Sequence, residues 1–278
     1  MSYITFKTIG GAGDLGSQVQ QYASLYAVAK ASGKTIVFPE SSLKLDYGFK
    51  FANLLDIPIE IKPDDFFKDF VDIRPDDRQL VDSSLFNLQP NVNYNVIHRF
   101  DLYKYWHPAC IEDVLSWNWN SEHQSIAEGL RKQLPVDKEL VAIHVRRGDY
   151  LLPQHDHFCK LDTDYYHEAI APYLDELEKY HFVIFSNDIE WCKEKLIEGD
   201  MVTFIEPGVD YSDLILMSLC DHFITANSSY SWWAAFRSRS KNKKVTCPVN
   251  YLKSYSPWSH INGNYYPSEW VGIHNRAI

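Results

Sequence analysis

Two adjacent arginines that follow a short apolar run are the residues best suited to chemistry with a charged ligand. The run, residues 141–145, is short enough for a buried parallel strand and too short for an ordinary helix, and Arg146 and Arg147 come directly after it. A guanidinium stays charged in proteins and presents a planar set of donors that suits phosphate oxygens. Since ligands bind beyond the carboxyl ends of strands in open α/β sheets, the pattern predicts an anion site, with surface ion pairs as the alternative.

The two residues after the arginines fit the same prediction. Gly148 permits a close backbone approach or an unusual turn. Asp149 can accept a hydrogen bond from an arginine and hold it in place. We therefore expect residues 146–149 to form one loop in which a carboxylate orients a cation.

A second anion site is predicted where a strand pattern gives way to a helical one. Asn227, Ser228 and Ser229 lie at this change, so hydroxyls and the backbone N–H groups of a helix N-terminus come together there. A simpler interpretation is that Ser228 or Ser229 is the N-cap of the helix. The two interpretations are compatible.

A glycine-rich stretch near the N-terminus is a competing ligand site. Residues 11–16 fit G-x-G-x-x-G between a strand predicted at 3–9 and a helix predicted at 18–32, and Glu40 ends the next strand, 34–40. This pattern is typical of NAD-binding folds and makes an NAD-dependent oxidoreductase an alternative. The same glycines also suit any other anion, sugar or backbone that approaches a helix N-terminus closely. The NAD hypothesis leaves the arginine loop unexplained.

Two short motifs suggest metal binding, and we favour another role for each. Asp162-Thr-Asp164 matches a D-x-D metal motif, but it directly precedes an apolar helical pattern and is better explained as a helix cap. His155, His157 and Cys159 lack a second cluster of ligands, so a polar loop near a ligand is favoured over a zinc site. We expect no metal ion.

The second half of the chain alternates strands and helices regularly. The predicted strands are 140–145, 181–186, 201–206, 222–227 and 244–247, and the predicted helices are 165–179, 189–198, 212–220 and one through Trp232, Trp233 and Phe236. Such alternation specifies a parallel sheet that is covered on both faces. With the strand, glycine loop and helix at the start, it predicts an α/β protein of two Rossmann-like halves, residues 1–135 and 136–278.

The stretch between the two patterns is harder to interpret. Residues 41–120 show no regular alternation, and a helix is expected only after them, from 121 to 133. Several aromatic side chains of this stretch could stack on sugars, although we expect most of them in the core: Tyr103, Tyr105, Trp106, Trp117 and Trp119.

The composition indicates a globular protein and limits its partners. The chain has 278 residues, 45% of them hydrophobic and 23% charged, which excludes a disordered or fibrous class. A net charge of -10 argues against non-specific nucleic-acid binding and makes a local pair of arginines more specific for one anion. No apolar stretch approaches the roughly 18 residues of a membrane span, which leaves only peripheral membrane contact open. The five cysteines lack Cys-x-x-Cys spacing, so we expect reduced thiols in a cytoplasmic protein.

Three motifs together resemble the alpha-1,2-fucosyltransferases of glycosyltransferase family 11. They are His144-Val-Arg-Arg-Gly-Asp-Tyr150, Phe185-Ser-Asn-Asp-Ile-Glu-Trp191 and the run from Asp213 to Trp233, in matching order and spacing. Gly16-Ser-Gln-Val-Gln-Gln-Tyr-Ala23 is also similar to the N-terminal motif of the family. The resemblance implies a GT-B-like architecture of two Rossmann-like domains that face each other across a cleft. Residues 1–135 would form the acceptor side and residues 136–278 the GDP-fucose side.

The resemblance also implies an activity and a set of site residues. The activity is transfer of L-fucose from GDP-fucose to a galactose-containing glycan, at O2 of a terminal galactose, with inversion and without a metal ion or other cofactor. Arg146 would stabilise the charge that grows on the departing GDP, with Asp149 positioning it. The implied donor-binding residues are His144, Arg147, Ser186, Asn187, Asp188, Asn227, Ser228 and Ser229. A non-catalytic module that binds a GDP-sugar or a glycan is a third hypothesis.

Two departures from the family pattern affect the substrates. The loop before Gly16 is lengthened and Ser17 replaces an asparagine, which leaves the choice of acceptor open. Asn187 replaces a more usual aspartate beside the nucleotide.

The base that accepts the proton of the acceptor hydroxyl is open among Asp14, Asp149, His155 and Asp156. An inverting displacement needs its base on the face opposite GDP, which favours Asp14 in the lengthened glycine loop.

Overall fold

The computed structural model describes residues 1–11, 13–76, 78–97, 102–206 and 208–276. The chain divides into two compact units, Met1–Asn120 and Ser121–Ile278. This boundary differs from the predicted one at 135/136, because helix α4 (Ser121–Arg131) packs within the second unit. There the ring of His123 lies 4.7 Å from that of Tyr211 in helix α7 (Asp210–Ser218).

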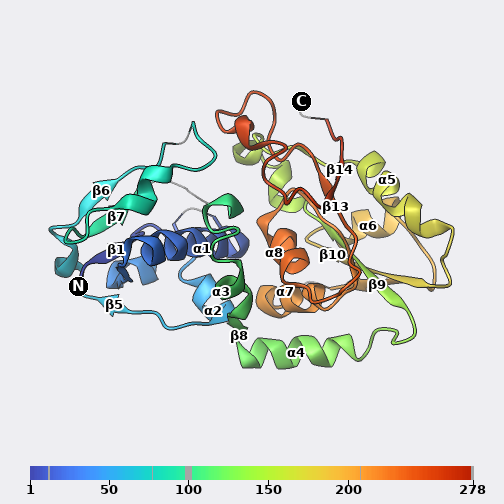
Figure 1. The fold of residues 1–278 in the computed structure, drawn as a ribbon. Helices are drawn as coiled ribbons and strands as arrows, with labels where there is room; N and C mark the ends of the chain where they lie inside the picture. The colour runs from blue at the N-terminus through green and yellow to red at the C-terminus, as the bar shows by residue number, and fades with distance from the viewer. Residues whose placement is uncertain (12, 77, 98–101, 207, 277–278) are drawn as a thin grey trace. The chain divides into compact units, whose positions relative to one another are not determined.

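The second unit contains a parallel sheet in which β9 has a strand on either side. Its strand order is β11-β10-β9-β12-β13-β14, and Figure 1 labels β9, β10, β13 and β14 of this sheet. The strands are β9 (Glu139–Val145), β10 (Tyr180–Ser186), β11 (Val202–Ile205), β12 (His222–Ile224), β13 (Val245–Pro248) and β14 (Val271–Ile273). The first five overlap predicted strands, although β12 ends three residues earlier than predicted, and their parallel pairing is confirmed. Strand β14 was not predicted, because its three residues include Gly272 and carry little apolar pattern.

The helices of the second unit begin close to the predicted positions. They are α5 (Thr163–Leu174), α6 (Ile189–Lys195), α7 (Asp210–Ser218) and α8 (Ser229–Arg237). Asp162 is the N-cap of α5, and its Oδ1 accepts a hydrogen bond from the N–H of Tyr165 at 3.2 Å. The predicted cap is therefore confirmed. Helices α5 and α6 end earlier than predicted.

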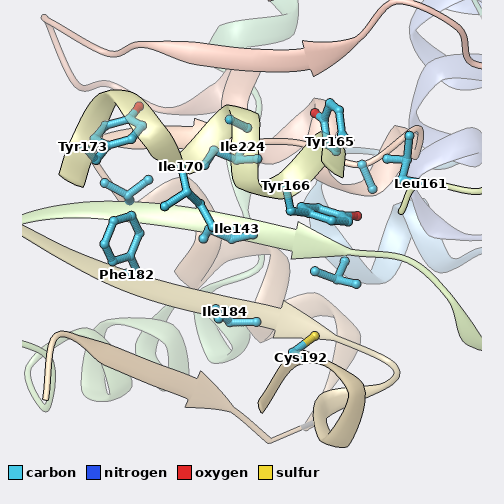
Figure 2. Close-up of a cluster of buried hydrophobic side chains, with 14 of the residues drawn as sticks. Ile143, Leu161, Tyr165, Tyr166, Ile170, Tyr173, Phe182, Ile184, Cys192 and Ile224 are labelled. Atoms are coloured by element: carbon cyan, nitrogen blue, oxygen red, sulfur yellow. The ribbon is translucent and has the colours of Figure 1, made fainter. Parts of the chain in front are cut away.

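The alternation of side chains along β9 separates a core face from a second face. Val141, Ile143 and Val145 belong to a buried cluster with residues of α5, α6 and β10. Figure 2 shows Ile143 of this cluster between α5 side chains and Phe182. His144 points the other way, as successive residues of a strand do, and its ring lies 5.4 Å from that of Tyr230 in α8. Burial of each large apolar side chain stabilises the unit by about 1.5–3 kcal/mol, which makes β9 a rigid support for the loop beyond it.

The first unit begins with the predicted strand, helix and strand. They are β1 (Tyr3–Thr5), α1 (Leu15–Ser32) and β2 (Thr35–Ile36), and the parallel sheet has the order β2-β1-β7-β6. The remaining elements are β3 (Phe38–Pro39), α2 (Lys50–Leu54), β4 (Leu55–Asp56), β5 (Ile61–Lys62), β6 (Val71–Ile73), β7 (Tyr94–Val96), α3 (Ile111–Ser116) and β8 (Asn118–Trp119). These short strands, joined by 3-10 turns, explain why residues 41–120 show no readable period.

The aromatic stretch of the first unit lies largely in the core, as expected. Trp106 is fully buried and donates from Nε1 to Gln20 Oε1 at 3.2 Å. The ring of Trp117 lies 5.3 Å from that of Tyr22 in α1. Tyr103 and Tyr105 are buried as well. These side chains support α1, and the stacking of Trp106 on a sugar is excluded by its burial.

All five cysteines are free and buried, and burial raises the pKa of Cys159 and of Cys192 to about 11. Over the described ranges, no helix combines the length and the apolar character that crossing a membrane requires.

Candidate functional site

Arg146 is held by the carboxylate that the sequence predicted. Its Nη2 donates to Asp149 Oδ2 at 2.8 Å, and its guanidinium carbon lies 5.6 Å from the centre of the Tyr150 ring. The Arg146 side chain is still 29% exposed. Because the residue directly follows β9, the structure places an oriented and accessible cation at the carboxyl edge of the sheet.

Arg147 is held by a different element. Its Nε donates to Asp188 Oδ2 at 3.1 Å, and its guanidinium carbon lies 4.2 Å from the centre of the Trp191 ring. Asp188 is also the N-cap of α6, where it accepts from the N–H of Trp191 at 3.3 Å. Such a cation–π contact contributes about 0.5–2 kcal/mol. Trp191 was missed as a site residue, although its place three positions after an N-cap aspartate was the available signal.

Asn187 joins the loops that follow β9 and β10. Its Oδ1 accepts from the N–H of Arg147 at 3.0 Å, and its Nδ2 donates to Asp149 Oδ1 at 3.2 Å. An aspartate at this position would lose the second hydrogen bond and place a like charge beside Asp149. The asparagine that departs from the family pattern therefore fits its neighbours.

Gly148 is required by this arrangement for reasons of space. A Cβ atom at residue 148 would lie 2.4 Å from Asn187 Nδ2 and 2.9 Å from its Cγ. Atoms in real structures do not approach a Cβ this closely, so a side chain here displaces the amide that bridges the two loops.

Ser186 completes the segment beside the arginine loop. Residue 186 pairs with Val145 in the parallel register of β9 and β10, so residues 186–188 run alongside residues 145–147. Ser186 Oγ accepts from the N–H of Asp188 at 2.9 Å. The structure thus brings Ser186, Asn187 and Asp188 to the arginines, as the sequence suggested.

The segment from β12 to α8 forms the third loop at this edge. Ser228 is the N-cap of α8 and its hydroxyl accepts from the N–H of Tyr230 at 3.3 Å. Asn227 donates from Nδ2 to the carbonyls of Cys159 at 2.7 Å and Tyr251 at 3.0 Å. Both amide hydrogens of Asn227 are therefore used within the protein, which gives this residue a loop-shaping role. Ser229 is the first residue of α8, where the helix dipole favours an anion.

His144 lies beneath the loops. The residue is 5% exposed, and burial, followed by the charge of Arg146, lowers the pKa of its imidazole to about 3. The ring is therefore neutral at physiological pH and adds no positive charge for a phosphate. Its packing against Tyr230 supports the beginning of α8.

Asp14 begins α1 in the first unit. It is the N-cap residue and its Oδ1 accepts from the N–H of Leu15 at 2.7 Å. The same carboxylate forms an ion pair with Lys50 Nζ at 2.5 Å. The side chain is 43% exposed, so it has a structural role and remains accessible.

The glycines of the N-terminal loop approach the protein's own backbone. Gly10 has φ 89°, and a Cβ there would lie 2.3 Å from the carbonyl oxygen of Gly48. The carbonyl of Gly10 accepts from the N–H of Tyr47 at 3.0 Å. Ala12, within the G-x-G-x-x-G pattern, lies outside the described residues. The close approach at Gly10 thus needs no dinucleotide to explain it.

Asp156 is engaged by three donors. Lys160 and Lys253 each contact its Oδ1 at 3.0 Å, and the Tyr255 hydroxyl donates to Oδ2 at 2.5 Å. These hydrogen bonds, that of Tyr255 foremost, hold the pKa of Asp156 well below its usual range. A strongly stabilised carboxylate is a poor base, which argues against this candidate.

The described residues contain no group of three or more His, Cys, Asp or Glu placed to hold a metal ion.

These features define the class of protein. Two α/β units with parallel sheets are the architecture of a GT-B-like fold. Fucosyltransferase NodZ from Bradyrhizobium superposes with TM-score 0.56 at 12% identity, over 84% of this chain and 93% of that one. Arabidopsis thaliana FUT1, solved as a mutant in complex with GDP, gives TM-score 0.55 at 11% identity, over 91% of this chain and 71% of that one. The GT-B-like fold predicted from the sequence is confirmed.

The chain belongs to glycosyl transferase family 11, whose sequence profile matches residues 2–274. The Escherichia coli alpha-1,2-colitosyltransferase is 40% identical over 148 residues, which are 48% of this chain and 47% of that protein. Mouse galactoside alpha-(1,2)-fucosyltransferase 2 is 25% identical over 289 residues, covering 96% of this chain and 78% of the relative. The human galactoside alpha-(1,2)-fucosyltransferase 1 is 33% identical over 175 residues, 58% of this chain and 46% of that protein. The chain thus matches about half the length of the bacterial and human relatives.

The contact between Gly148 and Asn187 gives a first testable prediction. Under the GDP-binding function proposed below, Gly148→Ala displaces the Asn187 amide, which loosens Arg147 and Asp149, and we expect GDP affinity to fall about tenfold. Isothermal titration calorimetry with GDP measures this. The matched control is Gly129→Ala in α4, where nothing lies within 4 Å of the new Cβ and helix propensity favours alanine by about 1 kcal/mol. Equal GDP affinity in the two variants would contradict the role given to Gly148.

Proposed function

We propose that this protein transfers L-fucose from GDP-fucose to a hydroxyl of a galactose-containing glycan, O2 of a terminal galactose, with inversion and without a metal ion. The observation that carries the proposal is the pair of oriented arginines at the end of β9 in a family 11 chain. The activities of the mouse and human relatives, as their names state them, support the transferred sugar, the acceptor and the linkage.

The chemistry follows from where charge develops. The bond between C1 of fucose and the β-phosphate oxygen breaks, the sugar becomes oxocarbenium-like, and negative charge grows on the departing GDP. A cation that is already oriented stabilises this charge more in the transition state than in the ground state. Arg146, fixed by Asp149, has this role, and the N-terminus of α8 adds a favourable dipole.

The nucleotide side is formed by the neighbouring loops. Arg147, with Ser186, Asn187 and Asp188, borders the guanosine and its diphosphate, while Ser228 and Ser229 lie at the phosphate end. His144 and Asn227 support the loops and do not bind the nucleotide directly. His144 is buried and neutral, and Asn227 donates both amide hydrogens to the carbonyls of Cys159 and Tyr251.

The acceptor oxygen attacks C1 from the face opposite GDP and gives up its proton to a base. We propose Asp14 for this step, supported by its place in the lengthened loop and by its partial exposure. Asp149 is committed to Arg146 and Asn187, and Asp156 to its lysines and Tyr255.

A second donor is favoured by one specific observation. The Escherichia coli relative at 40% identity is named a colitosyltransferase, and colitose is fucose without its 3-hydroxyl group. A donor that carries colitose on GDP would present the same nucleotide, so the loops described above would serve either sugar. Family membership favours transfer of either sugar over an NAD-dependent oxidoreductase.

The buried, free cysteines support the proposal that the protein works in the cytoplasm with reduced thiols.

A product assay tests the function directly. The enzyme is incubated with a galactoside and either GDP-fucose or GDP-colitose, with and without EDTA, and the linkage of the product is read by NMR. A fucosylated product at O2 that forms equally with EDTA supports the proposal. Transfer of colitose alone would make GDP-colitose the donor in place of GDP-fucose. Loss of activity with EDTA would overturn metal independence. Binding of GDP without transfer would indicate a binding module.

The role of Arg146 gives a second prediction. We expect Arg146→Ala to lower kcat by about 100-fold or more, because removing one group that stabilises transition-state charge has this order of effect. Steady-state kinetics with GDP-fucose measures the loss, and thermal unfolding shows whether the fold is kept. Arg78→Ala, at a side chain that is 86% exposed in the first unit, is the matched control and should leave kcat unchanged. A kcat of Arg146→Ala close to that of the control would refute the mechanism.

Asp14 gives a third prediction. Asp14→Asn should lower kcat about 100-fold while keeping the stability of α1, because asparagine caps a helix as well as aspartate does. Asp162→Asn makes the same change at the N-cap of α5 and should leave kcat intact. Turnover of Asp14→Asn near the wild-type value, with both substrates still bound, would remove Asp14 as the base.

A further inference from the structure

Three tyrosine hydroxyls hold three consecutive backbone carbonyls between β12 and α8. Tyr165 donates to the carbonyl of Thr225 at 2.6 Å, Tyr266 to that of Ala226 at 3.3 Å and Tyr150 to that of Asn227 at 3.1 Å. Strand β12 ends at Ile224, so these carbonyls lie beyond the strand, and a buried carbonyl needs a partner. The tyrosines supply these partners.

The three tyrosines come from separate parts of the second unit. Tyr165 lies in α5, and Tyr266 lies in the loop before β14. Tyr150 lies in the 3-10 turn Gly148–Leu151, which directly follows Arg146 and Arg147. The bond from Tyr150 therefore joins the loop that carries Arg146 to the residue just before the N-cap of α8.

The ring of Tyr150 is packed against two neighbouring side chains. The ring of Phe158 stacks on it at 4.3 Å with an interplanar angle of 6°, and the Arg146 guanidinium carbon lies 5.6 Å from its centre. The residue is buried, and burial raises the pKa of its hydroxyl well above 10, so it remains a donor throughout the working pH range. One rigid side chain thus contacts the cation and fixes the helix N-terminus.

We infer that Tyr150 is a positioning residue that sets the placement of Arg146 relative to the N-terminus of α8, so that both act on one diphosphate. This inference rests on the proposed function for its substrate. Only Tyr150 among the three joins the carbonyl segment to the arginine loop. A purely structural role predicts a loss of stability in each hydroxyl variant, but no loss of GDP affinity and turnover that is confined to Tyr150.

The three tyrosines provide their own controls. Tyr150→Phe, Tyr165→Phe and Tyr266→Phe each remove one hydroxyl and keep the ring, so each should lower Tm. Tyr150→Phe also removes a hydrogen bond with Tyr251. We expect Tyr150→Phe alone to raise the Kd of GDP about fivefold and to lower kcat about tenfold, with the KM for the galactoside unchanged. The two control variants should stay within about twofold of the wild type in kcat and in GDP affinity.

The results for the three variants distinguish a failure of the positioning role of Tyr150 from a failure of the proposed fucosyl transfer. Similar losses of kcat and GDP affinity in all three variants, or wild-type values in Tyr150→Phe, would overturn the positioning role. If the wild type itself transfers no sugar, the proposed function fails, and the inference is then judged by GDP calorimetry alone. Weaker GDP binding confined to Tyr150→Phe supports it in that case, and equal binding in the three variants rejects it.

Discussion

The fixing of two neighbouring guanidinium groups by separate carboxylates is the constraint on which the site in the second unit depends. Arg146 and Arg147 follow directly after β9, which ends at Val145. Each has its own carboxylate, Asp149 for the first and Asp188 for the second. Ion pairs as exposed as these contribute about 0–1 kcal/mol to stability, so their main contribution is orientation. A preorganised cation avoids reorganisation when charge develops on a leaving group.

The sheet explains why three loops can cooperate around these arginines. In the parallel register Val145 lies beside Ser186, and Ile143 beside Ile224, so the loops after β9, β10 and β12 leave the sheet at one edge. Hydrogen bonds then connect neighbouring loops: Asn187 joins the first to the second, and Tyr150 joins the first to the third. Gly148 provides the space for the first connection. The site is therefore one network of contacts on a rigid support.

Much of this could be predicted because the signals are local. The apolar run before Arg146 gave a strand, and the spacing of strands and helices after it gave the parallel sheet. Asp162 was recognised as a cap because capping depends on the few residues that follow it. The contacts of Tyr150 with Asn227, and of Arg147 with Trp191, could not be read in this way, because they join residues far apart in sequence. The boundary at 120/121 was missed for the same reason, since α4 is assigned by what it packs against.

The roles proposed for residues of the two units agree with the demands of glycosyl transfer. When the bond to the leaving group is largely broken before the acceptor oxygen attacks, most of the charge to be stabilised lies on GDP, and little has yet developed on the acceptor. Such a reaction needs strong, fixed positive charge on the donor side and only modest help from its base. Residues Ser121–Ile278 supply two oriented guanidinium groups and a helix N-terminus. The proposed base in Met1–Asn120 is a carboxylate that also caps α1 and pairs with Lys50, and such secondary duties are tolerable only because the donor side performs most of the stabilisation.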